Sequence, residues 1–168
     1  MRRFLITSVA ALSVSAFATN ALSNGGFENG MEGWMNEGGE VSPESHDGEL
    51  ALMVRQTAAR WAGAWRKVSI PDGVRTVKAS GWLRSDSVRG GQGSWERGRL
   101  SIEFHDAKGD TVGGFPLAVG QVRGKTPWTR MERVYAVPQG AKWLKLECAL
   151  GNATGTLYCD DIAVTLEP

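Results

Sequence analysis

The sequence predicts an all-β fold, a sandwich of two antiparallel sheets, on three observations. Glycine is abundant, with 22 residues in a chain of 168, which is about twice its usual share. Clusters of glycine, proline, asparagine and aspartate recur at short intervals along the chain. Between these turn signals, short segments alternate apolar and polar residues, as strands with one buried face do. Many such strands separated by turns are typical of a sandwich.

The first residues predict a secretory signal peptide at residues 1–18. Arg2 and Arg3 precede an apolar run of small residues at 4–17, and an Ala-x-Ala triplet ends at Ala18. This order of charge, apolar run and cleavage motif is characteristic of export signals. Cleavage after Ser23 is an alternative. A membrane anchor is disfavoured because the run is shorter than the ~20 residues that span a bilayer, so we expect a secreted or periplasmic protein.

The remaining residues, 24–168, are enough for one domain with a sizeable core. The formal net charge is +1 for the whole chain and −1 without Arg2 and Arg3, which provides no field for capturing nucleic acid or acidic membranes. No second long apolar run occurs, so we expect no membrane insertion. The chain is 42% hydrophobic and 22% charged, which excludes general disorder. The seven tryptophans suggest surfaces on which a flat ligand could stack.

Four segments with regular alternation are the strongest strand predictions, at residues 77–84, 99–105, 143–150 and 162–166. Their apolar positions are expected in the core: Val77, Ala79, Gly81 and Leu83; Leu100, Ile102 and Phe104; Leu144, Leu146, Cys148 and Leu150; Ile162, Val164 and Leu166. The opposite faces are mostly polar. Between the first two segments, the polar and glycine-rich stretch 85–98 is too long for a hairpin turn, and loops of this length are often functional.

The segment 54–68 allows two interpretations. Its apolar residues recur at intervals of four and three, which is helical spacing: Val54, Ala58, Trp61, Trp65 and Val68. Gly63 interrupts this pattern and Pro71 ends it. We therefore expect a strand, a loop and a second strand. On that interpretation Trp61 and Trp65 form either a second stacking platform or a lid on the core.

Several motifs, in order, resemble those of carbohydrate-binding modules with the galactose-binding-like jelly-roll fold, the type found beside cellulases and xylanases. The matching segments are 24–30 with Gly33-Trp34, 47–52, 79–84, 104–109, Trp128-Thr129, 137–141 and 158–162. Together they cover nearly all of residues 24–166. The resemblance implies a jelly-roll sandwich that binds a glycan. The same signature occurs in domains that bind no sugar, because a fold does not by itself fix a ligand.

Sugar recognition makes specific demands on side chains. A pyranose ring has an apolar face that stacks on an aromatic ring, and its hydroxyl groups need hydrogen-bond partners. We therefore expect ligand-binding roles for Trp82 and Arg84 on one strand, Glu103 and His105 on the next, and Trp95 at the rim. If both strands lie in one concave sheet, an aromatic platform lies beside charged groups. Packing within the sheet is the alternative for Trp82.

The family commonly holds a structural calcium ion, so the resemblance implies one here. Calcium prefers six to eight oxygen ligands. The matched motifs give Glu28, Glu49 and Asp160 as metal-site residues, with the backbone near Glu49 supplying carbonyl oxygens. Asp160 is also in phase with Ile162 and Val164, so we expect it to point inward. A buried carboxylate needs a cation, an arginine or backbone N–H groups as partners.

The two cysteines leave a disulfide open. Export permits a bridge between Cys148 and Cys159. Cys148 lies on the apolar face of its strand, whereas Cys159 is out of phase with Ile162 and Val164. A simple hairpin would therefore not join them, but a bulge or placement in different sheets would.

Catalysis has little support in the sequence. His46 and His105 are too few for a multi-histidine zinc site, and no nucleophile elbow occurs. We therefore expect a secreted, non-catalytic protein that binds a plant or microbial polysaccharide or oligosaccharide. The alternative is a periplasmic or cell-surface structural or adhesion domain that contacts a protein partner. A small glycan hydrolase is a third possibility.

Overall fold

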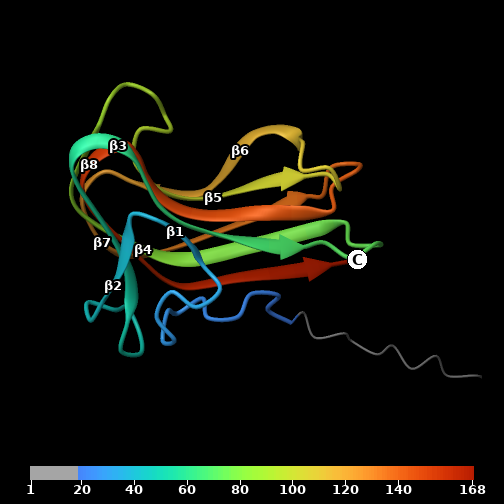
Figure 1. Ribbon diagram of the computed structural model, residues 1–168, viewed down its shortest axis with the longest axis horizontal. Helices are drawn as coiled ribbons and strands as arrows, with labels where there is room; N and C mark the ends of the chain where they lie inside the picture. Colours follow the sequence, from blue (N-terminus) through green and yellow to red (C-terminus); the bar gives the residue numbers. More distant parts are fainter. Residues whose placement is uncertain (1–18) are drawn as a thin grey trace, which may run out of the picture.

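The computed structural model describes residues 19–168, and the signal peptide expected at 1–18 lies outside the described residues. The described part forms eight strands and no α-helix (Figure 1). No membrane-spanning helix is therefore found among these residues. The strands are β1 (Met35–Glu37), β2 (Gly39–Ser42), β3 (Ala51–Ser69), β4 (Thr76–Gly90), β5 (Gly98–His105), β6 (Thr111–Val122), β7 (Gly124–Ala136) and β8 (Trp143–Glu167).

The strands form two antiparallel sheets that share β3 and β8. In the first sheet, the order is β6, β5, residues 143–150 of β8, residues 62–69 of β3, and β1. In the second sheet, the order is β7, β4, residues 153–167 of β8, the first part of β3, and β2. The predicted jelly-roll sandwich of two antiparallel sheets is confirmed.

Both shared strands bend where they pass from one sheet to the other. The pairing register of β3 with β8 shifts between Gln56 and Ala62. On β8 the bend contains Asn152 and Gly155, whose φ angles are +41° and +103°. Figure 1 shows β3 and β8 curling at one end of the sandwich. The expected loop within 54–68 is therefore a bend in one continuous strand, and the helical alternative is wrong.

The core lies between the two sheets and contains the predicted apolar positions. All of them are buried except Leu166, which is half-buried. The sheets approach closely at Gly81 of β4, where an added Cβ would lie 3.0 Å from Leu100 of β5. Side chains alternate along a strand. Trp82 follows Gly81 on β4 and Arg99 precedes Leu100 on β5, so both point away from the core. They lie on opposite faces of the sandwich because the two strands are in different sheets.

A bulge in β8 changes the direction of Asp160 and Cys159. Asp161 has a φ of +46°, and the β4–β8 register shifts at this point, so that Asp160 lies opposite Trp82 and Cys159 opposite Leu83. Cys159 therefore points into the core. Asp160 is fully buried, as expected, but the direction inferred from strand phase is wrong, because Asp160 shares the outer face of the sheet with Trp82.

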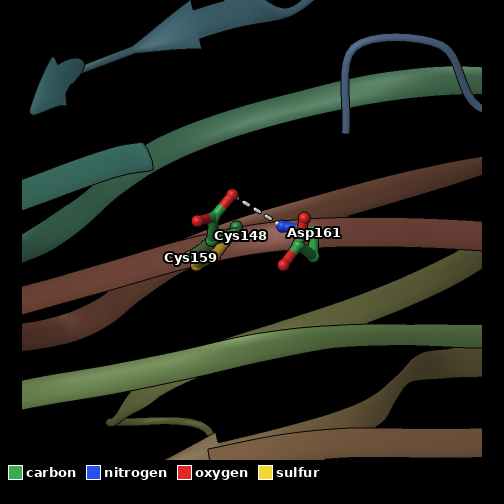
Figure 2. The surroundings of a disulfide bond; sticks show 4 residues. Cys148, Cys159 and Asp161 are labelled. Atoms are coloured by element: carbon green, nitrogen blue, oxygen red, sulfur yellow. Dashed lines mark hydrogen bonds between the residues drawn. A yellow bond between two sulfur atoms is a disulfide. The ribbon is translucent and has the colours of Figure 1, made fainter. Parts of the chain in front are cut away.

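The bulge allows a disulfide across the core. Cys148 belongs to the part of β8 in the first sheet and Cys159 to the part in the second, and their Cα atoms are 6.8 Å apart (Figure 2). Both cysteines are buried. Placement in different sheets, one of the two arrangements that the sequence left open, thus joins them.

Reducing this disulfide should lower the stability of the domain. The bridge spans 11 residues of sequence, and a loop of this size stabilises the folded state by about 2 to 3 kcal/mol in the chain-entropy model. Urea unfolding with and without reductant measures the change. In the variant with both Cys148 and Cys159 replaced by alanine, the unfolding midpoint should be the same with and without reductant. Equal unfolding midpoints for oxidised and reduced wild type would contradict the prediction.

Candidate functional site

A groove of about 610 Å³ lies on the outer face of the first sheet. Four segments contribute to it: β3, β5, β6 and the 91–97 loop between β4 and β5. Its lining residues are Trp61, Ser94, Trp95, Arg99, Phe115, Pro116, Ala118 and Gln121. The loop is shorter than the stretch 85–98 predicted from the sequence, because β4 continues to Gly90.

Aromatic side chains form the walls of the groove. Trp61 is 38% exposed, Trp95 is 44% exposed, and Phe115 is 93% exposed. Large aromatic residues left open to solvent around one concavity are typical of a binding surface. The sheet beyond the groove carries Trp65 and Trp143, with Lys145 over the first ring and Lys67 over the second.

The 91–97 loop holds Trp95 in place through main-chain contacts with the bend of β8. The amide of Gly151 donates a hydrogen bond to the Arg97 carbonyl over 2.9 Å. A Cβ at Gly151 would lie 2.3 Å from the Trp95 carbonyl oxygen and 3.1 Å from the Trp61 ring. The absence of a side chain at Gly151 therefore lets both aromatic walls approach the same point of the sheet.

A buried carboxylate orients Trp61. Glu147 of β8 is 6% exposed, and its Oε1 accepts hydrogen bonds from Trp61 Nε1 (3.1 Å) and Lys145 Nζ (2.9 Å). These contacts compensate the cost of burying the carboxylate. They also fix the edge of the Trp61 indole and leave its ring beside the groove.

Arg99 of β5 lines the groove and is 4% exposed. Its guanidinium lies 5.9 Å from the centroid of the Trp61 ring. Within residues 19–168, the buried Nε atom has no hydrogen-bond partner, and no carboxylate oxygen is close enough to form an ion pair with this guanidinium. Burial lowers the pKa of Arg99 from its ordinary value, and the charge of Glu147 opposes that shift.

A second hollow of about 370 Å³ continues along the sheet on the other side of Phe115 and Pro116, where Glu103 and Thr111 also line it. Glu103 Oε1 lies 2.9 Å from Nε2 of the buried His105. The His105 ring stacks on Trp143 with centroids 3.9 Å apart. His105 therefore supports Glu103 and Trp143 from within the sheet.

The five predicted ligand-binding residues lie on two opposite faces. Trp95, Glu103 and His105 belong to the face with the groove. Trp82 and Arg84 are on the outer face of the second sheet, because β4 and β5 are in different sheets. The expectation that these strands share one concave sheet is wrong.

Neighbouring side chains cover Trp82 and Arg84. His46 stacks on the half-exposed Trp82 ring with centroids 3.7 Å apart. Arg84 forms an ion pair with Glu44 over 2.8 Å and lies over the Tyr158 ring. The segment that carries Glu44 and His46 thus lies over this part of the second sheet.

Sequence reasoning left the role of Trp61 undecided and did not select Arg99, Phe115 or Gln121. Alternation of the buried Ala62, Ala64 and Val68 indicates that Trp61 points outward, but helical spacing in the same segment obscured this signal. Phe115 lies in a segment without alternation, so no pattern in the sequence identifies it.

The three predicted metal-site residues meet at the turn that contains residues 46–50. Asp160 Oδ2 accepts hydrogen bonds from the backbone N–H groups of His46 (2.8 Å) and Asp47 (3.3 Å). Its Oδ1 accepts one from the N–H of Asp161, drawn as a dashed line in Figure 2. Glu28 Oε1 accepts the amides of Glu49 and Leu50. Backbone N–H groups therefore satisfy the buried Asp160.

Burial raises the pKa of the Asp160 carboxyl above its ordinary value, and the three amide donors act against that shift. The residues described here contain no cluster of three or more histidine, cysteine, aspartate or glutamate side chains suited to a metal. A cation at this turn would therefore need main-chain oxygens in addition to the two carboxylates.

A family model for carbohydrate-binding domains, CBM_4_9, matches residues 19–155. The chain belongs to this family. A comparison with curated protein sequences finds no match. The family and the fold together support a glycan as the partner of this domain.

Among solved structures, the chain is similar to the CBM22-1 xylan-binding domain of Xyn10C from Paenibacillus barcinonensis, with 19% identity, a TM-score of 0.61, and coverage of 89% of this chain and 95% of that one. TmCBM61, solved with β-1,4-galactotriose, has 20% identity, a TM-score of 0.61, and coverage of 89% and 100%. The enzymatically active domain of tailspike protein 4 of bacteriophage CBA120 has 16% identity, a TM-score of 0.68, and 88% coverage of this chain. The chain spans 21% of that tailspike domain. These likenesses support the fold.

Replacing Gly151 by alanine should displace the aromatic walls. The new Cβ meets backbone atoms of Trp95 that cannot move alone, and overpacking of this kind costs about 1 to 3 kcal/mol. We expect a lower melting temperature and greater quenching of tryptophan fluorescence by acrylamide. Gly26→Ala is the matched control, since its Cβ would meet atoms only at 3.6 Å or more. Unchanged quenching in Gly151→Ala would contradict this account of how the loop is held.

Proposed function

We propose that the domain is a non-catalytic carbohydrate-binding protein and that a glycan chain binds in the groove on the first sheet. One observation carries the proposal: exposed aromatic rings flank a hollow that the buried Arg99 and the half-buried Gln121 also line. An apolar sugar face would stack on Trp95 or Trp61, and sugar hydroxyls would pair with Arg99 and Gln121. Stacking on aromatic rings supplies binding without requiring the sugar to lose hydrogen bonds.

The carboxylates on this face contact neighbouring side chains of the sheet, which favours a binding role without catalysis. Glycoside hydrolysis needs two carboxyl groups on either side of the scissile bond. Glu147 is buried and engaged by Trp61 and Lys145, and Glu103 contacts His105. Both carboxylates therefore hold other side chains of the sheet in position. We expect no release of reducing ends from any glycan that the protein retains.

The disulfide also bears on where the protein works. Disulfides persist in oxidising compartments such as the periplasm and the extracellular space. The Cys148–Cys159 bridge and the export signal predicted at 1–18 together favour a secreted or periplasmic protein. In that location a plant or microbial polysaccharide is accessible as a ligand.

Calcium at the turn 46–50 is a further part of the proposal. Glu28 and Asp160 approach this turn from two segments, and calcium takes carboxylate and main-chain oxygens. When bound, the ion would link the N-terminal segment to β8. The turn lies over the second sheet, so the ion would stabilise the fold without contacting the glycan.

Alanine substitutions should show which of the two outer faces of the sandwich binds the glycan. Trp95→Ala and Trp61→Ala remove walls of the groove, and loss of a stacking ring is expected to weaken retention by about tenfold or more. Affinity electrophoresis in gels containing xylan, β-galactan or β-glucan measures retention. The matched control is Trp82→Ala, a tryptophan of the opposite sheet.

If Trp82→Ala abolishes retention while both groove variants bind normally, the glycan lies on the second sheet and the groove assignment is wrong. If wild type is retained by no polysaccharide and by no glycan on a broad array, glycan binding is refuted. A contact with another protein then becomes the better explanation of the exposed aromatic rings.

Chelation should lower the melting temperature if calcium is bound. A ligand at about 100 times its dissociation constant stabilises by roughly 2.7 kcal/mol, or about 5 to 10 °C for a domain of this size. EGTA followed by excess calcium should remove and restore this stability. Asp160→Asn should lose the response, whereas Glu49→Gln should keep it, because Glu49 is expected to contribute only its backbone. Identical melting curves with and without EGTA would refute the calcium site.

A further inference from the structure

Among the described residues, the positive charge of Arg99 is offset only by the charge of Glu147, which acts from beyond ion-pair distance. It is 4% exposed, its Nε is buried without a partner, and among the described residues it forms no ion pair. A buried charge without a counter-charge is unfavourable in the folded state. The guanidinium lines the groove, so a group bound in the groove is the natural source of the missing contacts.

Glu147, whose charge acts on Arg99, does not supply the missing ion pair. Glu147 acts on Arg99 through its charge alone, and its Oε1 accepts hydrogen bonds from Trp61 Nε1 and Lys145 Nζ instead. The charge of Lys145 already balances that of Glu147 over 2.9 Å. Arg99 is also the one charged residue among the described residues that line the groove.

The shape of the Arg99 guanidinium determines which ligand group would bind it best. An arginine presents N–H donors in a planar fork that fits the two oxygens of a carboxylate. A neutral sugar hydroxyl can accept one of these bonds but brings no charge. The aromatic walls, Trp61, Trp95 and Phe115, suit the sugar ring that carries the carboxylate.

The second hollow opposes a fully acidic chain. Glu103 lines the hollow beyond Phe115 and Pro116, and it would repel a carboxylate on a neighbouring sugar. Among the described residues that line the two hollows, one cation, Arg99, and one carboxylate, Glu103, therefore favour a chain whose acidic groups are isolated from one another.

We propose that this groove selects a mostly neutral polysaccharide that carries single uronic acid units, with the uronate carboxylate bound to Arg99. This inference rests on the proposed function and specifies the ligand class of the same site. It goes beyond glycan binding because it assigns the buried arginine to a charged substituent.

Carboxyl reduction provides a test that changes only the ligand. The probes are glucuronoxylan and gum arabic, each in native form and after reduction of its uronic acids to neutral sugars, with polygalacturonate as a continuous polyuronate. Affinity electrophoresis of the full domain should show about tenfold weaker retention by each reduced polymer, since charge-assisted hydrogen bonds are the stronger class. Polygalacturonate should retain the protein less than native glucuronoxylan does.

Variants then assign the preference to Arg99. Arg99→Gln should bind native and reduced polymers equally, and Arg99→Lys should keep part of the preference. Arg130→Gln, a charge removed from the opposite sheet, should behave as wild type. The comparison of native and reduced polymers in wild type stands even if Arg99→Gln fails to fold.

The outcomes separate this inference from the proposed function. Equal retention of native and reduced polymers by wild type would overturn the uronate assignment and leave glycan binding intact. Stronger retention by polygalacturonate than by glucuronoxylan would overturn the requirement for isolated acidic units. No retention by any of these polymers would overturn the inference, and the broad array decides separately whether the domain binds glycans.

Discussion

The passage of β8 from one sheet to the other is the constraint on which the rest of the structure depends. Its first part pairs with β5 in one sheet and its second part with β4 in the other, while β3 follows it through both. The bend requires small residues and left-handed backbone angles, as at Gly155. It also places Gly151 beneath the 91–97 loop, so the same change of direction that closes the sandwich positions Trp95.

Much of the fold could be predicted because alternation records which face of a strand is buried. The positions Val77, Leu100 and Leu146 are in the core as expected. The bulge at Asp161 could not be predicted, since nothing in the local sequence requires a positive φ there. One inserted residue reverses the phase of every earlier side chain in the strand, which explains why Cys159 faces inward and Asp160 does not.

The candidate site was harder to predict because its residues come together only through sheet order. Alternation gave the outward direction of Trp82 and Glu103 correctly, but it carries no information on whether their strands are neighbours. Two outward residues can therefore lie on opposite surfaces of a sandwich. The family resemblance predicted the architecture, while the groove depends on loop length and on Phe115, neither of which follows from periodicity.

The late position of β8 in the chain has a consequence for biogenesis. β3, β4 and β5 all use this final strand as their hydrogen-bonding partner, so neither sheet is complete until residues 143–167 have been made. A nascent chain that lacks this strand therefore exposes unpaired strand edges, which are prone to intermolecular association. A polypeptide that ends before residue 143 lacks the centre of both sheets.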